Sequence, residues 1–393
     1  MRTICSMTRG TLAALTLALA SAPACAQAPA PVADAIAAGT FAYDRTAPLD
    51  LRDSLESVAD GLETHAISFA SPRGGRATGL LHVPRRAGRK AGIVFMHGAP
   101  GNARQSARHA EGLARRGAVV VSVDAPFARR TGGIIAFTEA DSAEQVQLVV
   151  DLQRAVDLLL ARADVDPARI AFVGGSYGAA VGTMFAAVDP RPATYVLFVP
   201  DGGVIAHFTG QDGARAPQLA DMPDAEWNRW VAAMRPVQGA FYADRIRPAA
   251  VLFQNGRQDP IIPVWKAERL HQAAGPSHTV MWYDGGHGLT AQARLDRYEW
   301  LAGRIGTDAP TAEECTAAAN PAPGGDGNAP AALSSRQRPI PGRHQRPAIH
   351  HGSPAVLHWV IRPPTDAQEH MKVSCYKIEM QVSLTLIRVW NSV

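Results

Sequence analysis

The sequence predicts an α/β domain whose mostly parallel sheet begins with an antiparallel hairpin and carries helices on both faces. From residue 91 to residue 305, apolar strand-like runs alternate with helical segments, which is the pattern of βαβ units. Before them, residues 65–71 and 78–84 flank a glycine-rich turn, as in a β-hairpin. The chain has 393 residues, 47% of them hydrophobic and 19% charged, so it can bury one sizeable core.

The individual elements follow from short apolar runs for the strands and from apolar stripes for the helices. We expect strands at residues 91–98, 118–126, 169–176, 193–199, 248–256 and 278–286. We expect helices at residues 103–117, 140–163, 177–188, 264–274 and 290–305. Residues 203–247 break the alternation and contain one short helix, so we expect a small cap over the carboxyl edge of the sheet.

The first 26 residues have the pattern of an export signal. Two arginines precede the apolar run at 11–20, which is too short to span a bilayer. Small residues at Ala24 and Ala26 predict cleavage after Ala26, and hence a periplasmic or secreted protein. The alternative is a lipoprotein anchored through Cys25. No later segment is long and apolar enough to cross a membrane.

The remaining boundaries follow from composition. Residues 27–63 are predicted to be an N-terminal lead-in, poorly structured over residues 27–39, and residues 64–306 to form the α/β domain. Residues 307–393 are rich in Pro, Gly, Ala and Arg, which predicts a disordered tail. The four cysteines lie near the two ends of the chain, so the domain between them has neither a disulfide framework nor thiolate zinc ligands.

The charge distribution argues against a nucleic-acid partner. The formal net charge is only +4, and the arginines are scattered instead of forming a basic face. The densest basic cluster, at residues 85–90, is interpreted as a solvated turn between strands. The sequence implies no metal and no organic cofactor, and it predicts a small-molecule substrate. It does not predict the oligomeric state.

A glycine-rich turn around Ser176 is the most informative motif. It follows an apolar strand that ends near Val173 and precedes a helix that begins near Tyr177. A turn this sharp needs small flanking residues, and Gly174 and Gly178 stand two positions either side of the serine. This is the G-x-S-x-G nucleophile elbow, which predicts Ser176 as a nucleophile. The alternative is an ordinary strand-to-helix turn that is merely rich in glycine.

A serine hydroxyl needs a base, which the elbow motif places downstream in the order Ser, Asp or Glu, His. His287 is the best candidate because it follows a predicted strand in a glycine-rich loop. His271 lies within a predicted helix and His278 opens a strand, so neither is favoured. His207, in the predicted cap, is the outside candidate.

A carboxylate is needed to orient the imidazole and to stabilise its charged form. Asp259 follows a late strand, in a loop braced by a proline, and is the favoured residue. Asp201 ends the preceding strand and is its rival. Asp284 is interpreted as a turn residue.

Backbone N–H groups are needed to stabilise the oxyanion that forms on the substrate. We expect one donor at Tyr177, just after the nucleophile, and the other at Ala99, with Gly98 as its neighbour. His97 is expected to hold this loop by hydrogen bonding and not to act as the base.

The segments HGAPGN, GGSYG, NGRQDPIIP and DGGHG, in this order, resemble the α/β-hydrolase superfamily, specifically its secreted dienelactone-hydrolase-like and esterase-like members. The resemblance spans residues 64–305 and implies the α/β-hydrolase fold. Dienelactone hydrolases proper use a cysteine nucleophile, whereas this chain has Ser176. Oligopeptidases with this catalytic domain carry a large N-terminal propeller, for which the fewer than about 70 residues before the sheet are too few.

The sequence therefore predicts an exported serine hydrolase that cleaves carboxylic esters through an acyl-enzyme. The alternatives are a thioesterase, a small-amide hydrolase or peptidase, halide- or peroxide-dependent chemistry on the same triad, and a non-catalytic binding protein with the same fold. The acyl and alcohol groups cannot be read from the sequence. Aromatic residues that could line the substrate pocket are Phe127, Tyr177, Phe208, Trp227 and Trp230, although both tryptophans could instead pack the cap onto the body.

Overall fold

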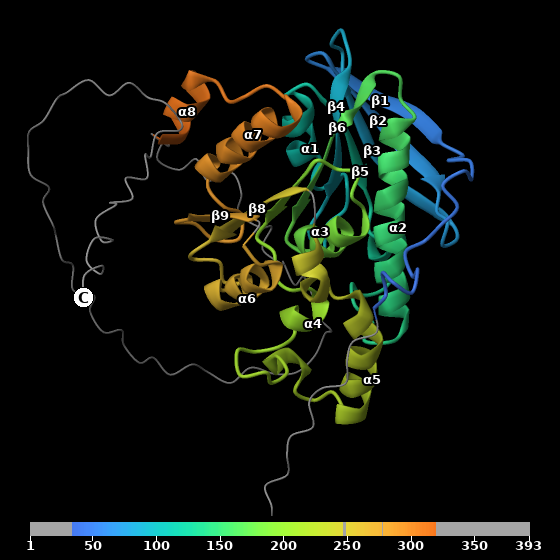
Figure 1. The fold of residues 1–393 in the computed structure, drawn as a ribbon, viewed down its shortest axis with the longest axis vertical. Coiled ribbons are helices and arrows are strands. Elements are labelled where there is room, and N and C mark those ends of the chain that lie inside the picture. Colours follow the sequence, from blue (N-terminus) through green and yellow to red (C-terminus); the bar gives the residue numbers. More distant parts are fainter. Residues whose placement is uncertain (1–33, 247–248, 277, 320–393) are drawn as a thin grey trace, which may run out of the picture. The chain divides into compact units, whose positions relative to one another are not determined.

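A nine-stranded sheet forms the centre of the computed structural model, which describes residues 34–246, 249–276 and 278–319 (Figure 1). Within these residues the strand order is β1-β2-β3-β5-β4-β6-β7-β8-β9. The strands are β1 (Arg52–Ala59), β2 (Leu62–Ala70), β3 (Arg76–Pro84), β4 (Lys90–Met96), β5 (Ala118–Val123), β6 (Val165–Gly175), β7 (Thr194–Phe198), β8 (Ala250–Gly256) and β9 (His278–Tyr283).

The sheet has an antiparallel end and a parallel end. The pairs β1–β2, β2–β3 and β3–β5 are antiparallel, and all pairs from β5 to β9 are parallel. Every residue of β4 and β5 is buried, as expected for strands covered on both faces. The predicted mixed sheet with an antiparallel start is confirmed.

Helices cover both faces of the sheet and form two separate hydrophobic clusters with it. One cluster contains residues of α1, α7 and α8, and the other contains residues of α2, α3, α6 and the cap. The helices that cover the sheet are α1 (Ala107–Ala114), α2 (Ala140–Leu160), α3 (Tyr177–Val188), α6 (Val264–Ala274), α7 (Ala291–Ile305) and α8 (Ala312–Ala319).

The segment between β7 and β8 is the predicted cap, and it is built from short helices. These are α4 (Val204–His207), α5 (Asp224–Met234) and the 3-10 turns η2 (Pro217–Leu219), η3 (Arg235–Val237) and η4 (Gly239–Arg245). A further 3-10 turn, η1 (Pro126–Arg129), follows β5. Residues 247 and 248, at the end of the predicted cap, lie outside the described residues.

Strand β1 lies within the predicted lead-in at residues 27–63, where the sequence predicted no strand. The strand pairs with β2 along its length, with a bulge between Leu55 and Ser57. All eight of its residues are exposed, so the sequence lacks the apolar alternation by which a half-buried strand is recognised. Earlier in the same segment, Ala35 and Phe41 are buried in the core, and the Ala35 N–H donates to the Tyr242 hydroxyl at 3.0 Å.

Helix α8 corrects the predicted start of the disordered tail at residue 307. Its Cys315 is buried in the same cluster as Ile305 at the end of α7. The Arg86 guanidinium also binds Asp308 at 2.6 Å, which ties the connection between the two helices to the body. The predicted export signal at 1–26 and the predicted tail beyond 319 lie outside the described residues. In the part of the chain that the structure describes, no helix combines the length and apolar character needed to cross a membrane.

Candidate active site

Ser176 occupies the tight turn between β6 and α3. Its φ of 52° and ψ of −119° are unusual for a residue with a side chain, and such geometry costs about 1–3 kcal/mol. The neighbouring glycines make the turn possible. A Cβ on Gly174 would lie 2.5 Å from the Gly178 carbonyl oxygen, and a Cβ on Gly175 would collide with the Phe198 ring. The sequence folds this way because only glycine fits at these positions.

The structure brings Ser176, His287 and Asp259 together. His287 Nε2 lies 2.9 Å from Ser176 Oγ, and His287 Nδ1 lies 2.7 Å from Asp259 Oδ2. The serine comes from the end of β6, the aspartate from the loop after β8 and the histidine from the loop after β9. All three therefore stand at the carboxyl edge of the parallel strands, where open α/β sheets bind their ligands.

Asp259 is held more rigidly than His287. The aspartate side chain is 1% exposed, and its Oδ1 accepts hydrogen bonds from the backbone N–H groups of Ile261 and Ile262 at 2.8 and 2.9 Å. The His287 side chain is 20% exposed. Because Asp259 accepts the Nδ1 proton, Nε2 presents its lone pair to the serine hydroxyl.

The other acidic and histidine candidates lie elsewhere. Asp284 is exposed and 3.5 Å from Arg257, as expected of a turn residue. His271 packs against His278 and Phe253, and burial lowers the pKa of His271 to about 4. Burial also lowers the pKa of His278.

The two remaining rivals pair with each other. His207 Nδ1 lies 2.9 Å from Asp201 Oδ2, and Asp201 Oδ1 accepts a hydrogen bond from the Gly203 N–H at 3.0 Å. Asp201 therefore orients a histidine of the cap and not His287. Nothing in the sequence pattern predicts that these two residues form a pair of their own.

The loop after β4, which carries the predicted donor Ala99, lies against the serine. A Cβ on Gly98 would stand 3.2 Å from Ser176 Cβ, and a Cβ on Gly178 would stand 2.6 Å from the His97 carbonyl oxygen. The Tyr177 N–H opens helix α3, where backbone donors have no partner within the helix. The predicted donors therefore come from two segments that meet at Ser176.

The His97 side chain holds the loop after β4 in place through two hydrogen bonds. The Ala125 N–H donates to His97 Nε2 at 3.0 Å, so Nδ1 carries the proton and donates to the Gly98 carbonyl at 2.8 Å. Burial lowers the pKa of His97, which favours this neutral form. Further along the loop, the Ala103 N–H donates to Asp124 Oδ1 at 2.8 Å.

The aromatic residues predicted to line the substrate pocket divide into two groups. Phe127 packs edge-on against Tyr177, with ring centroids 5.4 Å apart. Phe208, Trp227 and Trp230 belong to a cap cluster in which Trp230 is only 1% exposed. The burial of Trp230 favours the alternative expectation, in which this side chain packs the cap onto the body.

Two residues of this cluster were not singled out by the sequence. Phe137 has a φ of 58° and packs against both Phe208 and Trp230 at 5.1 Å. Asp141 is buried at the start of α2 and accepts the Trp230 indole N–H at 2.8 Å. The acidic residue at the first turn of a helix was a usable signal for Asp141, but nothing marked Phe137.

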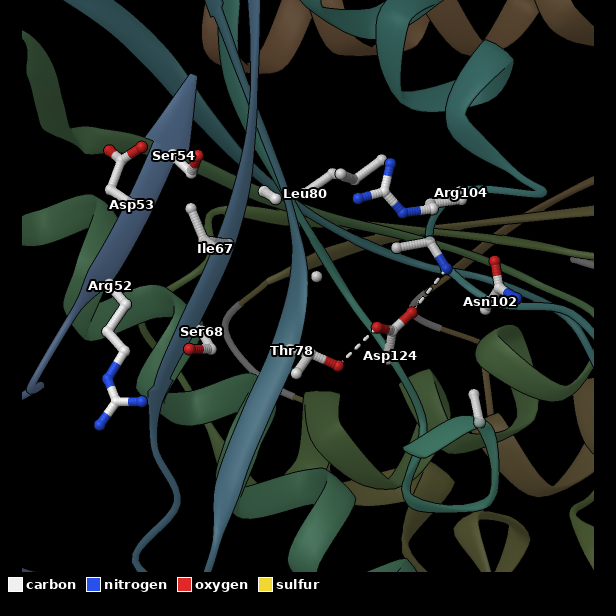
Figure 2. A pocket seen from close by; sticks show the side chains of 14 residues that line it. Arg52, Asp53, Ser54, Ile67, Ser68, Thr78, Leu80, Asn102, Arg104 and Asp124 are labelled. Carbon is white, nitrogen blue, oxygen red and sulfur yellow. Dashed lines mark hydrogen bonds between the residues drawn. The ribbon is translucent and has the colours of Figure 1, made fainter. Parts of the chain in front are cut away.

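A cavity of about 460 Å³ lies at the antiparallel end of the sheet and is separate from the group formed by Ser176, Asp259 and His287 (Figure 2). Figure 2 shows Thr78 bonded to Asp124 in the lining of this cavity, where the Thr78 hydroxyl donates to Asp124 Oδ2 at 2.6 Å. The other oxygen of Asp124 accepts the Ala103 N–H at 2.8 Å. Arg104 reaches across from the loop and forms an ion pair with Glu56 of β1. None of Ser176, Asp259 and His287 lines this cavity.

Across residues 34–246, 249–276 and 278–319, no group of three or more His, Cys, Asp or Glu side chains could hold a metal ion.

Known proteins provide an independent comparison. The family model described as the prolyl oligopeptidase family matches residues 105–302, which is just over half of the chain and includes Ser176, Asp259 and His287. No curated protein matches the sequence.

Among the solved structures with a similar fold are two acetyl xylan esterases. An acetyl xylan esterase from Paenibacillus sp. R4 gives a TM-score of 0.54 at 20% identity, over 69% of this chain and 93% of that chain. Acetyl xylan esterase 1 from Thermoanaerobacterium sp. JW/SL YS485 gives a TM-score of 0.53 at 19% identity, over 65% of this chain and 87% of that chain. At such low identity the likeness shows the fold alone, and that fold is the α/β-hydrolase fold.

Proposed function

The chain belongs to the prolyl oligopeptidase family of the α/β-hydrolase superfamily, and from this premise we propose that it is a serine hydrolase of carboxylic esters. Ser176 is the nucleophile, His287 the general base and acid, and Asp259 the carboxylate that orients the imidazole. The observation that carries this proposal is the continuous hydrogen-bond chain from Asp259 through His287 to Ser176.

The proposed reaction has two halves. His287 Nε2 takes the proton from Ser176 Oγ while this oxygen bonds to the ester carbonyl carbon. The tetrahedral intermediate collapses, the bond to the alcohol oxygen breaks, and His287 returns its proton to the departing alcohol. A water molecule then attacks the carbonyl carbon of the acyl-Ser176 ester and gives a proton to His287. The bond from this carbon to Ser176 Oγ breaks, His287 returns the proton to Oγ, and the acid is released.

The negative charge on the carbonyl oxygen is stabilised by the backbone N–H groups of Ala99 and Tyr177. Donors of this kind are worth about 2.7–4 kcal/mol each to the transition state. Their effect depends on preorganisation, which is provided here by the bonds of His97 to Gly98 and Ala125.

Ester cleavage is the first candidate because both similar solved structures are named as esterases. Amide cleavage is the second candidate, since the matching family is named for peptidases and an amide can react by the same steps. The two differ in the leaving group, because a departing amine must be protonated by His287 before it can leave.

Labelling and turnover together test the proposal. A fluorophosphonate should modify Ser176 in the wild type, and the Ser176→Ala variant should lose both labelling and hydrolysis of acyl p-nitrophenyl esters. A panel that adds acyl-CoA thioesters and aminoacyl amides should give its highest kcat/KM on the esters. Equal labelling of the wild type and Ser176→Ala would contradict the nucleophile, and a higher kcat/KM on amides would favour the second candidate.

We further propose that the protein is exported, on the strength of the signal pattern in residues 1–26. Expression in a Gram-negative host should give a periplasmic protein whose mature N-terminus is Gln27. A lipid-modified Cys25 at the N-terminus would instead identify a lipoprotein.

A further inference from the structure

The protein contains a second His–Asp pair built like the one beside Ser176. Asp201 comes three residues after the end of β7, and Asp259 comes three residues after the end of β8. In each pair Oδ2 of the aspartate meets Nδ1 of the histidine, at 2.9 Å for His207 and at 2.7 Å for His287.

Oδ1 of each aspartate also accepts a backbone hydrogen bond, from the same position along the chain. Asp201 Oδ1 accepts the N–H of Gly203 at 3.0 Å, and Asp259 Oδ1 accepts the N–H of Ile261 at 2.8 Å. Both donors stand two residues beyond their aspartate. The two carboxylates are therefore fixed by the same local turn on neighbouring parallel strands.

The segment that leads to the second pair begins beside the serine. The Phe198 carbonyl accepts the Ser176 N–H at 2.9 Å. Asp201 is three residues further along, and an extended chain covers at most about 3.6 Å per residue, so its Cα lies within about 11 Å of Phe198. Lys266 of α6 donates to the His207 carbonyl, and α6 begins directly after the Ile261–Ile262 turn that holds Asp259.

His207 and His287 differ in the hydrogen-bond partner of Nε2. The His207 side chain is 38% exposed, and within the described residues its Nε2 has no hydrogen-bond partner. The Asp201 side chain, in contrast, is only 5% exposed. Because the buried Asp201 carboxylate accepts the Nδ1–H, the lone pair of Nε2 points away from Asp201 and is open to a hydrogen-bond donor.

We propose that His207 is a specificity-determining residue that accepts a hydrogen bond from a free hydroxyl group of the ester substrate, and that Asp201 positions it. The inference rests on the proposed ester hydrolysis. A neutral hydroxyl fits better than an ammonium group, because the cationic Lys266 lies against His207 and balances the charge of Asp201. The favoured substrate class is therefore an ester with a hydroxyl near its scissile bond.

Matched pairs of esters test this assignment. Glycerol monoacetate and propyl acetate differ in hydroxyls on the alcohol side, and methyl 3-hydroxybutyrate and methyl butyrate differ on the acyl side. The selectivity is the ratio of kcat/KM within each pair. In at least one pair, His207→Leu should lower this ratio about tenfold, the effect of one lost hydrogen bond.

Two further variants separate positioning from packing. His207→Gln keeps an acceptor oxygen and should restore part of the ratio. Asp201→Asn no longer fixes the Nδ1–H tautomer and should lower the ratio as His207→Leu does. The matched control is His65→Leu, because His65 also bonds an aspartate, Asp53 at 2.6 Å, but at the far end of the sheet. This control should leave the ratio unchanged.

The outcomes are distinct. An unchanged ratio in His207→Leu, or an equal loss on both esters of every pair, would overturn the role of His207 while leaving the ester hydrolase intact. Hydrolysis of none of the four esters by the wild type, with Ser176 unreactive toward fluorophosphonate, would overturn the proposed function and this inference with it.

Discussion

The two ends of the sheet differ in the strain of the turns that finish their strands. At the parallel end, Ser176 after β6, Val199 after β7 and Leu289 after β9 have φ values of 52°, 49° and 58°. At the antiparallel end, the non-glycine residues with positive φ beside β1 are Asp50 and Asp60. Aspartate tolerates this conformation, whereas a β-branched residue such as Val199 is a true outlier.

This difference shows at which end of the sheet the backbone is held in unfavourable conformations. Strained backbone persists only where the surrounding structure enforces it, and it clusters at functional sites. The antiparallel end has the cavity of about 460 Å³ but a relaxed backbone, and its Asp124 carboxylate is occupied by Thr78 and residue 103. The strained turns and the contacts among Ser176, His287 and Asp259, and not the available volume, therefore mark the candidate site.

The largest expected effect comes from Asp259→Asn. The asparagine keeps the shape but favours the wrong tautomer of His287, so kcat on an activated ester should fall about 10⁴-fold. Asp53→Asn, which alters the His–Asp pair at the antiparallel end, should leave kcat unchanged. A loss of less than tenfold in Asp259→Asn would mean that another group orients His287.

Trp230→Ala should be the most destabilising change in the cap. The side chain is 1% exposed and its indole N–H is bonded to Asp141, so its removal leaves a cavity and takes one of the hydrogen bonds from the buried carboxylate. The free energy of unfolding measured in urea should fall by about 3–5 kcal/mol. A loss below about 1 kcal/mol would show that the cap does not depend on this anchor.

Gly178→Ala should destabilise the elbow by about 2–3 kcal/mol, because the added Cβ would stand 2.6 Å from the His97 carbonyl oxygen. Gly303→Ala in α7 is the matched control, since its Cβ would meet nothing within 4 Å. The control should be neutral or slightly stabilising in the same urea titration. Equal midpoints for the two variants would contradict the tight packing of the elbow.

Acid should weaken the antiparallel end through His82. Burial lowers the pKa of His82 to about 4 from 6.5, so between these values the unfolded chain binds more protons than the folded one. The stability that depends on neutral His82 is present above pH 6.5 and is lost as the pH falls toward 4. His82→Gln should remove roughly 1–2 kcal/mol of this loss, which urea titrations at pH 7 and pH 4.5 would measure. If the unfolding free energy of His82→Gln changed between the two pH values as much as that of the wild type does, this role of His82 would be contradicted.

Arg104→Ala should have the smallest effect. Its ion pair with Glu56 crosses the cavity near the surface, where the Arg104 side chain is 63% exposed. Such pairs contribute less than about 1 kcal/mol, so urea midpoint and ester turnover should both stay close to the wild type. A large loss of activity would mean that the cavity wall controls the loop that carries Ala99.

The parts of the molecule that sequence reasoning predicted are those with strong local signals. The buried parallel strands, the glycine-flanked turn at Ser176 and the order of Asp259 and His287 all follow from short patterns. Strand β1 was not predicted because all of its residues are exposed, and α8 was not predicted because the composition of its segment suggested disorder.

Contacts between distant segments could not be predicted. The pairing of Asp201 with His207 depends on how the cap turns back after β7. Likewise, the contact of Phe137 with Trp230 joins the loop before α2 to the cap helix α5, across more than ninety residues. Such contacts depend on tertiary packing, so no periodicity or spacing in the sequence predicts them.

The rate at which a fluorophosphonate labels Ser176 tests the central claim most directly, because it reports activation of the serine without depending on a substrate. His287→Gln should lower the second-order labelling rate about 10³-fold, the usual contribution of a general base, with the thermal midpoint little changed. A folded His287→Gln variant that is labelled within tenfold of the wild-type rate would contradict the account.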